Sequence, residues 1–293
     1  MILLTGATGA VGRALLRRLT AARTPVRCLV RDPRRLGAER VRVQIALGDL
    51  ADPASFRNAT RGVDTVIHLA ASTRDQPRAS IEELNAVATL RLVRAAERSG
   101  TRDFVFFASI GAGLHAPTRF SRAKELARRA VEASDMQTTV FSPSIIYTPG
   151  ERWLTVLERF SYLPVMPLSG SGDALYQPIW ADDVADCVMA ALDRRAGPEH
   201  RAFELAGPET LSYEDIVRTA LRPTGRRRAL VHLPRPVVHG SLRVLERLTG
   251  PAAFATREEA ALLEEPMTSR RGTADAEALG VMPLRMSAVL GGA

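Results

Sequence analysis

The chain opens with Ile2-Leu3-Leu4-Thr5-Gly6-Ala7-Thr8-Gly9-Ala10-Val11-Gly12. An apolar run is followed by three spaced glycines, and apolar residues then recur at helical spacing. In such a unit Gly6 permits a sharp turn, Gly9 permits close approach to a pyrophosphate, and Gly12 permits tight packing of a helix on a strand. The helix that begins here directs free N–H groups and a positive dipole end at the phosphates. The stretch therefore predicts a nucleotide-binding turn after a first β-strand.

Strand and helix patterns alternate through the first half of the chain. Apolar runs typical of strands lie at 2–4, 26–30, 43–47, 65–69, 104–108 and 138–141, and helical stretches lie at 11–22, 53–60, 82–99 and 121–134. This alternation predicts the α/β class, with a doubly wound, Rossmann-type parallel sheet covered by helices on both faces. Residues 1–142 are expected to form a dinucleotide-binding domain. Residues 143–293 are expected to form a smaller, mostly helical substrate-binding lobe, with a late strand at 202–206 that returns to the sheet.

Composition excludes several classes of protein. The chain has 293 residues and a net charge of +8, but its arginines are spread along the sequence. The densest cluster, Arg226-Arg227-Arg228, is interpreted as a solvated loop, so we expect no nucleic-acid partner. No apolar run is long enough to span a membrane, which predicts no membrane partner and a cytoplasmic location. Cys28 and Cys187 lie in apolar runs and are expected to be buried free thiols, with no metal site.

These motifs resemble those of the short-chain dehydrogenase/reductase superfamily, especially its extended and atypical branches, whose glycine motif reads TGxxGxxG. The resemblance covers nearly the whole chain and implies a bound NAD(P). Asn85 matches an asparagine that the family carries on its fourth helix, although a polar residue on a helix face is an equally good interpretation. By position, the resemblance implies cofactor contacts from Thr5, Gly6, Thr8, Gly9, Ala10, Val11, Gly12, Arg31, Asp49, Leu50, Leu69, Ala70, Ala71, Lys124 and Pro143.

The end of the second predicted strand distinguishes NADP from NAD. Arg31 is the first residue past the strand, and a guanidinium suits a 2′-phosphate. Asp32 favours the ribose hydroxyls of NAD, but it comes one place later and precedes a proline. We therefore expect NADP rather than NAD. At least one of Arg34 and Arg35 is expected to lie in a solvated turn.

The family's catalytic groups are a serine, and a tyrosine and lysine spaced YxxxK. Ser109 matches the serine, and Phe120-Ser121-Arg122-Ala123-Lys124 retains the lysine, which is the single lysine among 40 basic residues. Phe120 replaces the tyrosine and has no proton to transfer, but its ring is expected to lower the pKa of Lys124. Tyr147, in a segment that resembles the family's RPxxxYGPG, and His115 are alternative proton donors. The candidate catalytic residues are Ser109, Lys124 and Tyr147.

Three functions fit this incomplete triad. In the first, Lys124 performs the acid/base step, as in isoflavone-reductase-like relatives, and the chain is an NADP-dependent oxidoreductase of a small carbonyl, enone or quinone-like substrate. In the second, another group replaces the tyrosine. In the third, the chain binds NADP(H) without turnover, like the accessory subunit of respiratory complex I, and acts as a sensor or assembly factor. The fold also admits non-redox chemistry such as isomerisation. The apolar face of the helix expected at 82–99 fits either a homo-oligomer contact or packing on the sheet.

Overall fold

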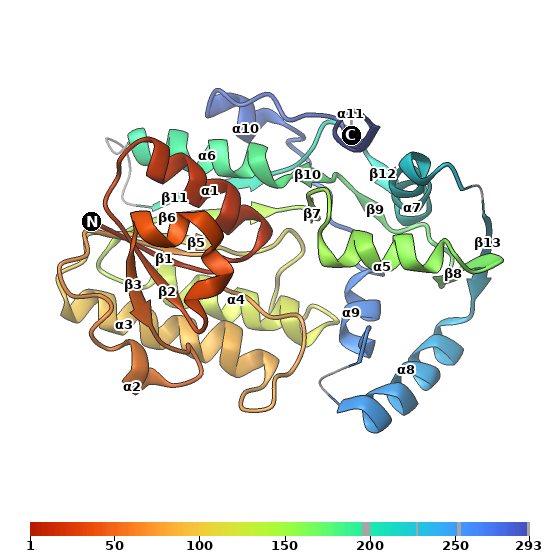
Figure 1. The fold of residues 1–293 in the computed structure, drawn as a ribbon, viewed down its shortest axis with the longest axis horizontal. Helices are drawn as coiled ribbons and strands as arrows, with labels where there is room; N and C mark the ends of the chain where they lie inside the picture. The colour runs from red at the N-terminus through yellow and green to blue at the C-terminus, as the bar shows by residue number, and fades with distance from the viewer. Residues whose placement is uncertain (195–199, 227, 251–252, 292–293) are drawn as a thin grey trace.

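The computed structural model describes residues 1–194, 200–226, 228–250 and 253–291. Seven parallel strands form one sheet in the order β11-β6-β5-β4-β1-β2-β3 (Figure 1). The strands are β1 (Ile2–Thr5), β2 (Val26–Val30), β3 (Gln44–Leu47), β4 (Thr65–His68), β5 (Asp103–Phe107), β6 (Gln137–Pro143) and β11 (His200–Leu205). The strand order reverses between β1 and β4, which is the place where open α/β sheets bind ligands. The predicted α/β class is confirmed.

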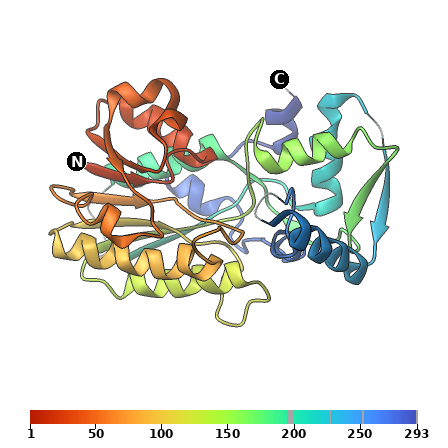
Figure 2. The same cartoon turned by 60° about the horizontal axis from the view of Figure 1, so that its bottom comes forward.

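Helices cover both faces of the sheet, and each face has its own apolar core. On one face α1 (Ala10–Ala21) packs against α6 (Ala181–Asp193), and on the other α3 (Ala88–Arg98) packs against α4 (Arg119–Glu132) (Figure 2). Shorter helices are η1 (Pro33–Arg42), α2 (Pro53–Phe56) and η2 (Glu83–Val87). Cys28 and Cys187 are both buried and free, as expected. The strands end at one edge, so the loops that follow them meet there.

The third strand is more exposed than its sequence predicts. The apolar run at 43–47 was expected to be covered on both sides. β3 is instead the edge strand of the sheet, and the side chains of Ile45 and Leu47 are exposed. The physical reason is that only the short η1 and α2 segments flank this edge.

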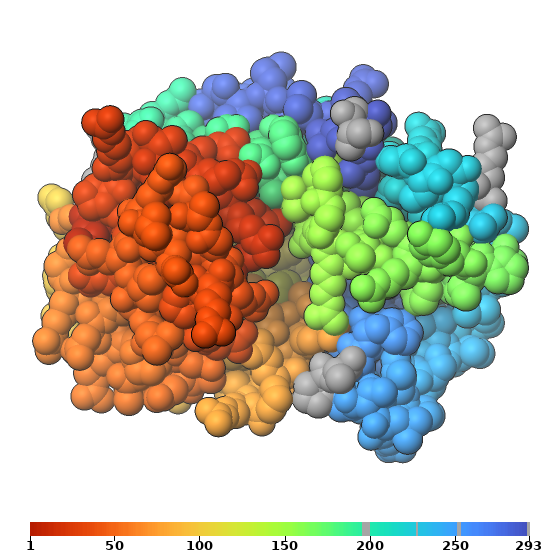
Figure 3. Space-filling model, viewed as in Figure 1, coloured from red at the N-terminus to blue at the C-terminus, as the bar shows by residue number. Residues whose placement is uncertain are grey.

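The C-terminal lobe combines helices with three two-stranded ribbons around a third apolar core. Its helices are α5 (Arg152–Phe160), α7 (Tyr213–Leu221), η3 (Arg222–Thr224), α8 (Arg235–Thr249), α9 (Arg257–Leu262), α10 (Ala274–Ala278) and α11 (Met286–Gly291). The ribbons pair β7 (Ile146–Tyr147) with β10 (Ile179–Trp180), β8 (Val165–Ser169) with β13 (Ala229–Leu233), and β9 (Leu175–Tyr176) with β12 (Leu211–Ser212). Between these elements the chain returns to the sheet through α6 and β11. Figure 3 shows the surface hollowed between the sheet domain and α5.

Candidate functional site

The turn between β1 and α1 requires glycine for steric reasons. Gly6 has a φ of +72°, and a Cβ there would lie 2.6 Å from the backbone nitrogen of Ala70. A Cβ at Gly12 would lie 2.1 Å from the carbonyl oxygen of Gly6. α1 can therefore begin close to the end of β1, which presents its N-terminal N–H groups at the sheet edge.

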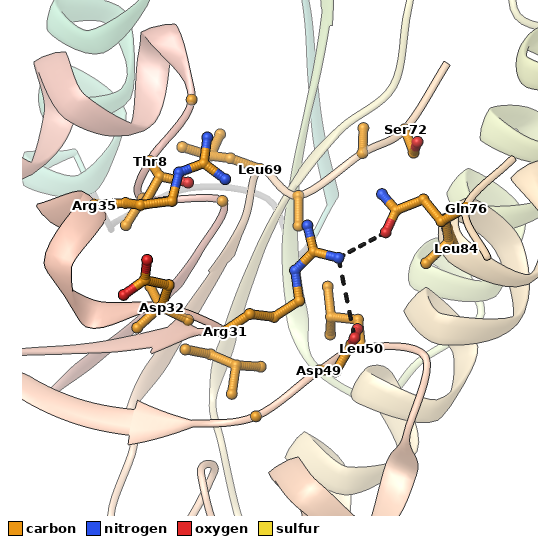
Figure 4. Close-up of a pocket in the computed structure, with 18 residues that line it drawn as sticks. Thr8, Arg31, Asp32, Arg35, Asp49, Leu50, Leu69, Ser72, Gln76 and Leu84 are labelled. Atoms are coloured by element: carbon orange, nitrogen blue, oxygen red, sulfur yellow. Dashed lines mark hydrogen bonds and ion pairs between the residues drawn. The ribbon is translucent and has the colours of Figure 1, made fainter. Parts of the chain in front are cut away.

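A cavity of about 300 Å³ opens at this edge, beside the turn (Figure 4). It lies at the ends of β1, β2 and β4, at the topological switch point of the sheet. Its lining contains many of the residues that the resemblance assigned to cofactor binding, namely Gly6, Thr8, Gly9, Arg31, Asp49, Leu50, Leu69, Ala70 and Ala71. The other predicted contacts do not line it: Thr5, Ala10, Val11 and Gly12 lie in β1 and the first turn of α1, and Lys124 and Pro143 lie in α4 and β6.

Arg31 extends across this first cavity from the end of β2 (Figure 4). Its Nη1 donates a 2.6 Å hydrogen bond to Oε1 of Gln76 and lies 4.0 Å from Oδ2 of Asp49. The carboxylate of Asp32 accepts a hydrogen bond from the backbone N–H of Arg34 and caps η1. Arg35 lines the cavity and Arg34 does not. Two guanidinium groups thus border a cavity beside a helix N-terminus, an arrangement that suits phosphate.

Asn85 holds the backbone that lines the same cavity. Its Nδ2 donates 2.8 Å hydrogen bonds to the carbonyl oxygens of Ser72 and Ile81, and its Oδ1 accepts a 3.2 Å bond from the N–H of Ser72. Asn85 lies in η2, a π-helical turn, and such turns occur frequently at functional sites. The side chain therefore positions the segment after β4 rather than lying on an exposed helix face.

His68, at the end of β4, is a fully buried core residue. Its Nδ1 lies 2.7 Å from Oγ1 of Thr5, and its Nε2 lies 2.9 Å from Oγ1 of Thr89. Burial, together with the charge of Lys124, lowers the pKa of His68 to about 3. The imidazole is therefore neutral and bridges β4 to its neighbours.

Ser109 and Lys124 lie together at the carboxyl end of β5. Nζ of Lys124 donates a 2.6 Å hydrogen bond to the carbonyl oxygen of Phe107, two residues before Ser109. The Ser109 hydroxyl is half-buried and donates a 3.2 Å hydrogen bond to the carbonyl of Ile110. Lys124 is thus hydrogen-bonded to the last residue of β5, and Ser109 follows that residue by two positions.

Carboxylates from the C-terminal lobe fix the beginning of α4, which carries Lys124. Glu258 accepts a 2.9 Å hydrogen bond from the backbone N–H of Phe120, and Glu265 accepts one of 3.0 Å from that of Thr118. Thr118 itself caps the helix at Ser121. These carboxylates interact favourably with the positive, N-terminal end of the α4 dipole. They also hold the C-terminal lobe against α4.

Aromatic rings enclose the Lys124 ammonium. Nζ lies 4.9 Å from the ring centroid of Phe106 and 5.7 Å from that of Phe120, and the residue is only 4% exposed. This burial lowers the pKa of Lys124 to about 7. The direction is the one expected from a phenyl ring at the tyrosine position. Lys124 can therefore exchange a proton near neutral pH.

Tyr147 lies in the core of the C-terminal lobe, opposite Trp180 in the β7–β10 ribbon. Its hydroxyl is buried and has no hydrogen-bond partner among the described residues. Burial and the nearby carboxylates of Asp183 and Glu209 raise the pKa of Tyr147. A phenol with a raised pKa is a poorer proton donor than Lys124. His115 is exposed on the loop between Ser109 and α4.

A second cavity, of about 530 Å³, lies between the sheet domain and the C-terminal lobe. Arg74, Arg119 and Ile81 line one side, and residues of α8 and α9 line the other. Gln76 lines both cavities. Glu258, which accepts the hydrogen bond from Phe120, also lines the second cavity. This cavity thus adjoins both the first cavity and the turn of α4 that carries Phe120.

Sequence reasoning missed several residues of the first cavity, among them Ser72, Gln76 and Leu84. Gln76 reaches Arg31 across 45 positions of sequence, from a loop with no motif of its own. Ser72 follows Ala71, and Leu84 precedes Asn85; the resemblance singled out both Ala71 and Asn85. Only Asn85, whose partner is Ser72, offered a signal.

A glycine turn and a cavity at the topological switch point of a parallel sheet are typical of dinucleotide-binding domains. Residues 6–195 match the family model described as NAD(P)H-binding. The chain belongs to this NAD(P)H-binding family. It is an NAD(P)-dependent oxidoreductase.

The named relatives of this NAD(P)H-binding protein include reductases. It is 29% identical over 227 residues to NAD(P)H azoreductase of Xenophilus azovorans, and the match covers 77% of this chain and 74% of that protein. It is 31% identical over 234 residues to (4-alkanoyl-5-oxo-2,5-dihydrofuran-3-yl)methyl phosphate reductase of Streptomyces griseus, with coverage of 77% and 74%. The NADPH-dependent quinone oxidoreductase of Escherichia coli, solved with NADPH, shares the fold with a TM-score of 0.75 at 16% identity, over 100% of this chain and 99% of that one.

Within the described ranges, no helix has both the length and the apolar character needed to cross a membrane.

Proposed function

We propose that this oxidoreductase uses NADPH to reduce a small conjugated acceptor, such as an enone, a quinone or an azo compound. One observation carries the proposal: Lys124 is a buried amine with a pKa of about 7, hydrogen-bonded to Phe107 at the end of β5, on the sheet edge that bears the first cavity. The names of the relatives support the substrate class, because an azo group and a 5-oxo-2,5-dihydrofuran ring are both conjugated acceptors.

The residues of the first cavity fit NADPH. The absence of side chains at Gly6 and Gly9 leaves room for a pyrophosphate at the N-terminus of α1. Arg31 and Arg35 supply positive charge for a 2′-phosphate. Asp32, the residue that would favour NAD, also lines the cavity, but its Oδ1 is used to cap η1. The pyrophosphate is common to NAD and NADP, so the two guanidinium groups and the capping role of Asp32 are what favour NADP over NAD.

The residues near Ser109 suit a reduction. When bound, the reduced nicotinamide supplies the hydride that the acceptor takes up. The Ser109 hydroxyl orients the acceptor oxygen, and the Lys124 ammonium donates the proton that balances the charge. One N–H of this ammonium is used on Phe107, so two remain for the cofactor ribose and the substrate. The Phe120 ring excludes water from the ammonium without competing for the proton.

Unpaired polar atoms in the lobe support a ligand site there. The Tyr147 hydroxyl, Nε1 of Trp180 and Oε2 of Glu151 are buried without hydrogen-bond partners among the described residues. Buried polar groups are rarely left unpaired, because an unmade hydrogen bond costs about 1–3 kcal/mol. A polar group of the cofactor or of the substrate can satisfy them, which gives Tyr147 a binding role rather than a proton-donating one.

The test begins with calorimetric titration of NADPH and NADH. Arg31→Ala should weaken NADPH binding by about tenfold to a hundredfold, because charge-assisted hydrogen bonds contribute about 1.5–3 kcal/mol, and should change NADH binding little. Arg34→Ala is the matched control, since Arg34 does not line the cavity. Equal effects of the two substitutions would contradict the assignment of Arg31.

Turnover is then measured as NADPH oxidation with quinones, enones and azo dyes. Lys124→Met should abolish it. NADPH binding without turnover on any acceptor would instead support a sensor or assembly factor that binds the cofactor without catalysis.

A further inference from the structure

The outer side of α8 carries a surface that the proposed reduction does not use. We propose that this surface docks on an anionic lipid membrane. It consists of an apolar stripe, Val237, Val244 and Leu248, and of two arginines beside it, Arg243 and Arg247. We call these five residues the α8 face.

The stripe follows from helical geometry. Positions 237, 244 and 248 are seven and four residues apart, so their side chains project from one side of the helix. Their exposed fractions are 57%, 55% and 80%. Leu242, on the opposite side, is the buried residue of α8 in the described structure. An amphipathic helix normally turns such a stripe inward, so a stripe left in solvent indicates a partner.

The sequence around α8 is rich in arginine, although Arg218 pairs with Glu214 and Arg235 with Glu264. Residues 216–245 contain seven arginines and two histidines and no aspartate or glutamate. Arg243 and Arg247 are exposed and have no ion-pair partner within the described residues. Arg226, from the cluster that sequence analysis assigned to a solvated loop, lies 3.8 Å from the ring centroid of Tyr162. Arg227 lies outside the described residues.

A second apolar patch lies near α8, at the end of the molecule away from the seven-stranded sheet (Figures 1 and 2). Tyr162, Val165 and Val231 are exposed there. Val165 pairs with Ala229 in the β8–β13 ribbon, so Val165 and Val231 lie on the same side of it. The ribbon that leads into α8 therefore adds further exposed apolar side chains at this end of the molecule.

An anionic bilayer can bind both the apolar stripe and the arginines of the α8 face. Aliphatic side chains enter the headgroup boundary, and arginines bind lipid phosphates. A second copy of the chain suits it less, because a two-fold contact would set arginines against arginines. A nucleic acid would leave the aliphatic stripe in water. Such docking departs from the expectation of no membrane partner, which rested on the lack of a spanning segment alone; a surface contact requires no spanning helix, and none is found among the described residues.

The inner side of α8 faces the second cavity, so docking on the outer side would bring a membrane close to that cavity. His239 and Glu246 of α8 line the second cavity. A membrane held against the α8 face would therefore lie one helix away from the cavity that adjoins the Phe120 turn.

The experiment is flotation of the full chain with vesicles, at low salt and at about 0.15 M salt. Phosphatidylcholine vesicles are compared with vesicles that also contain about 30% phosphatidylglycerol. We expect binding to the anionic vesicles that weakens as salt rises. Arg243→Gln with Arg247→Gln should reduce the partition coefficient by about thirtyfold, and Val244→Ser with Leu248→Ser by about tenfold.

Matched controls lie on other surfaces of the molecule. Arg91→Gln with Arg94→Gln on α3 removes the same charge, and Val41→Ser removes an equally exposed aliphatic group. Equal losses in these controls, or no binding to anionic vesicles at low salt, would overturn the proposal. A concentration-dependent dimer that the Val244→Ser/Leu248→Ser variant abolishes would also overturn it, in favour of self-association. NADPH binding, measured on every variant, should not change, so failure here is distinguishable from failure of the reductase proposal.

Discussion

Nζ of Lys124 lies 2.6 Å from the carbonyl oxygen of Phe107, and this bond ties the only lysine of the chain to the end of the strand that leads to Ser109. The bond fixes the amine without neutralising it, because a carbonyl carries no charge. With the rings of Phe106 and Phe120 on its other sides, the ammonium loses most of its hydration. The pKa of Lys124 therefore falls to about 7. Burial of the ammonium is thus the cause of its lowered pKa.

The first prediction concerns the pH dependence of reduction. If Lys124 donates the proton, only its protonated form is active, and its pKa is about 7. Turnover with NADPH should stay level below pH 7 and fall about tenfold per unit above it. Lys124→Arg keeps a positive charge but gives up its proton far less readily, so it should retain NADPH binding and lose turnover. A rate that stays level to pH 9 would assign the proton to another group. The measurement is kcat against pH for one acceptor.

The second prediction concerns stability. The pKa of a lysine is about 10.4 when unfolded, whereas folding lowers that of Lys124 to about 7. Between these values the unfolded chain binds more protons, so this residue makes stability rise with pH, and below pH 7 its contribution is level. In urea unfolding, the wild-type chain should gain about 2 kcal/mol relative to Lys124→Met between pH 7 and pH 9. Parallel curves for the two proteins would show that Lys124 titrates normally.

A third prediction concerns Asn85. Asn85→Ala removes two donors and one acceptor from the segment that lines the first cavity, and it leaves the N–H of Ser72 without this partner. Unpaired groups of this kind cost about 1–3 kcal/mol, so NADPH should bind about tenfold more weakly. Asn58→Ala is the natural control, because Asn58 is the other asparagine of the chain and is exposed. Calorimetric titration of both variants decides whether Asn85 positions the cavity.

Much of the fold could be predicted because its signals are local. The glycine spacing from Gly6 to Gly12 reflects steric limits within a single turn, and the structure shows those limits directly. The order of strands and helices follows from short apolar runs and their periodicity. The resemblance singled out Ser109 and Lys124, but the hydrogen bond from Lys124 to Phe107 is visible only in the structure.

Other features depend on contacts between distant segments and left no local signal. Gln76 lies in a loop without a motif, and only the folded sheet brings it to Arg31. The run at 43–47 resembles a buried strand, but in the fold it forms the edge of the sheet, where only the short η1 and α2 segments flank it. Val237, Val244 and Leu248 show ordinary helical periodicity. Whether such a stripe faces the core or the solvent is decided by the rest of the lobe.

The last prediction uses two glycines of the same turn to separate folding from binding. A Cβ at Gly12 would lie 2.1 Å from the Gly6 carbonyl oxygen and 2.8 Å from Cα of Ala7. Gly12→Ala must therefore displace α1, at a cost of roughly 1–3 kcal/mol, and its Tm should fall by several degrees. A Cβ at Gly9 would have its nearest neighbour at 3.4 Å, and its backbone is extended, so Gly9→Ala should melt like the wild type.

Gly9→Ala should nevertheless weaken NADPH binding by about tenfold, because the added methyl group stands where the backbone approaches the pyrophosphate. Thermal melting and calorimetric titration on the same two variants give the comparison. Unchanged NADPH affinity in Gly9→Ala would mean that the pyrophosphate does not lie on this turn. The cofactor would then have to bind elsewhere along the edge of the sheet, which would remove the basis for placing its reactive end beside Lys124.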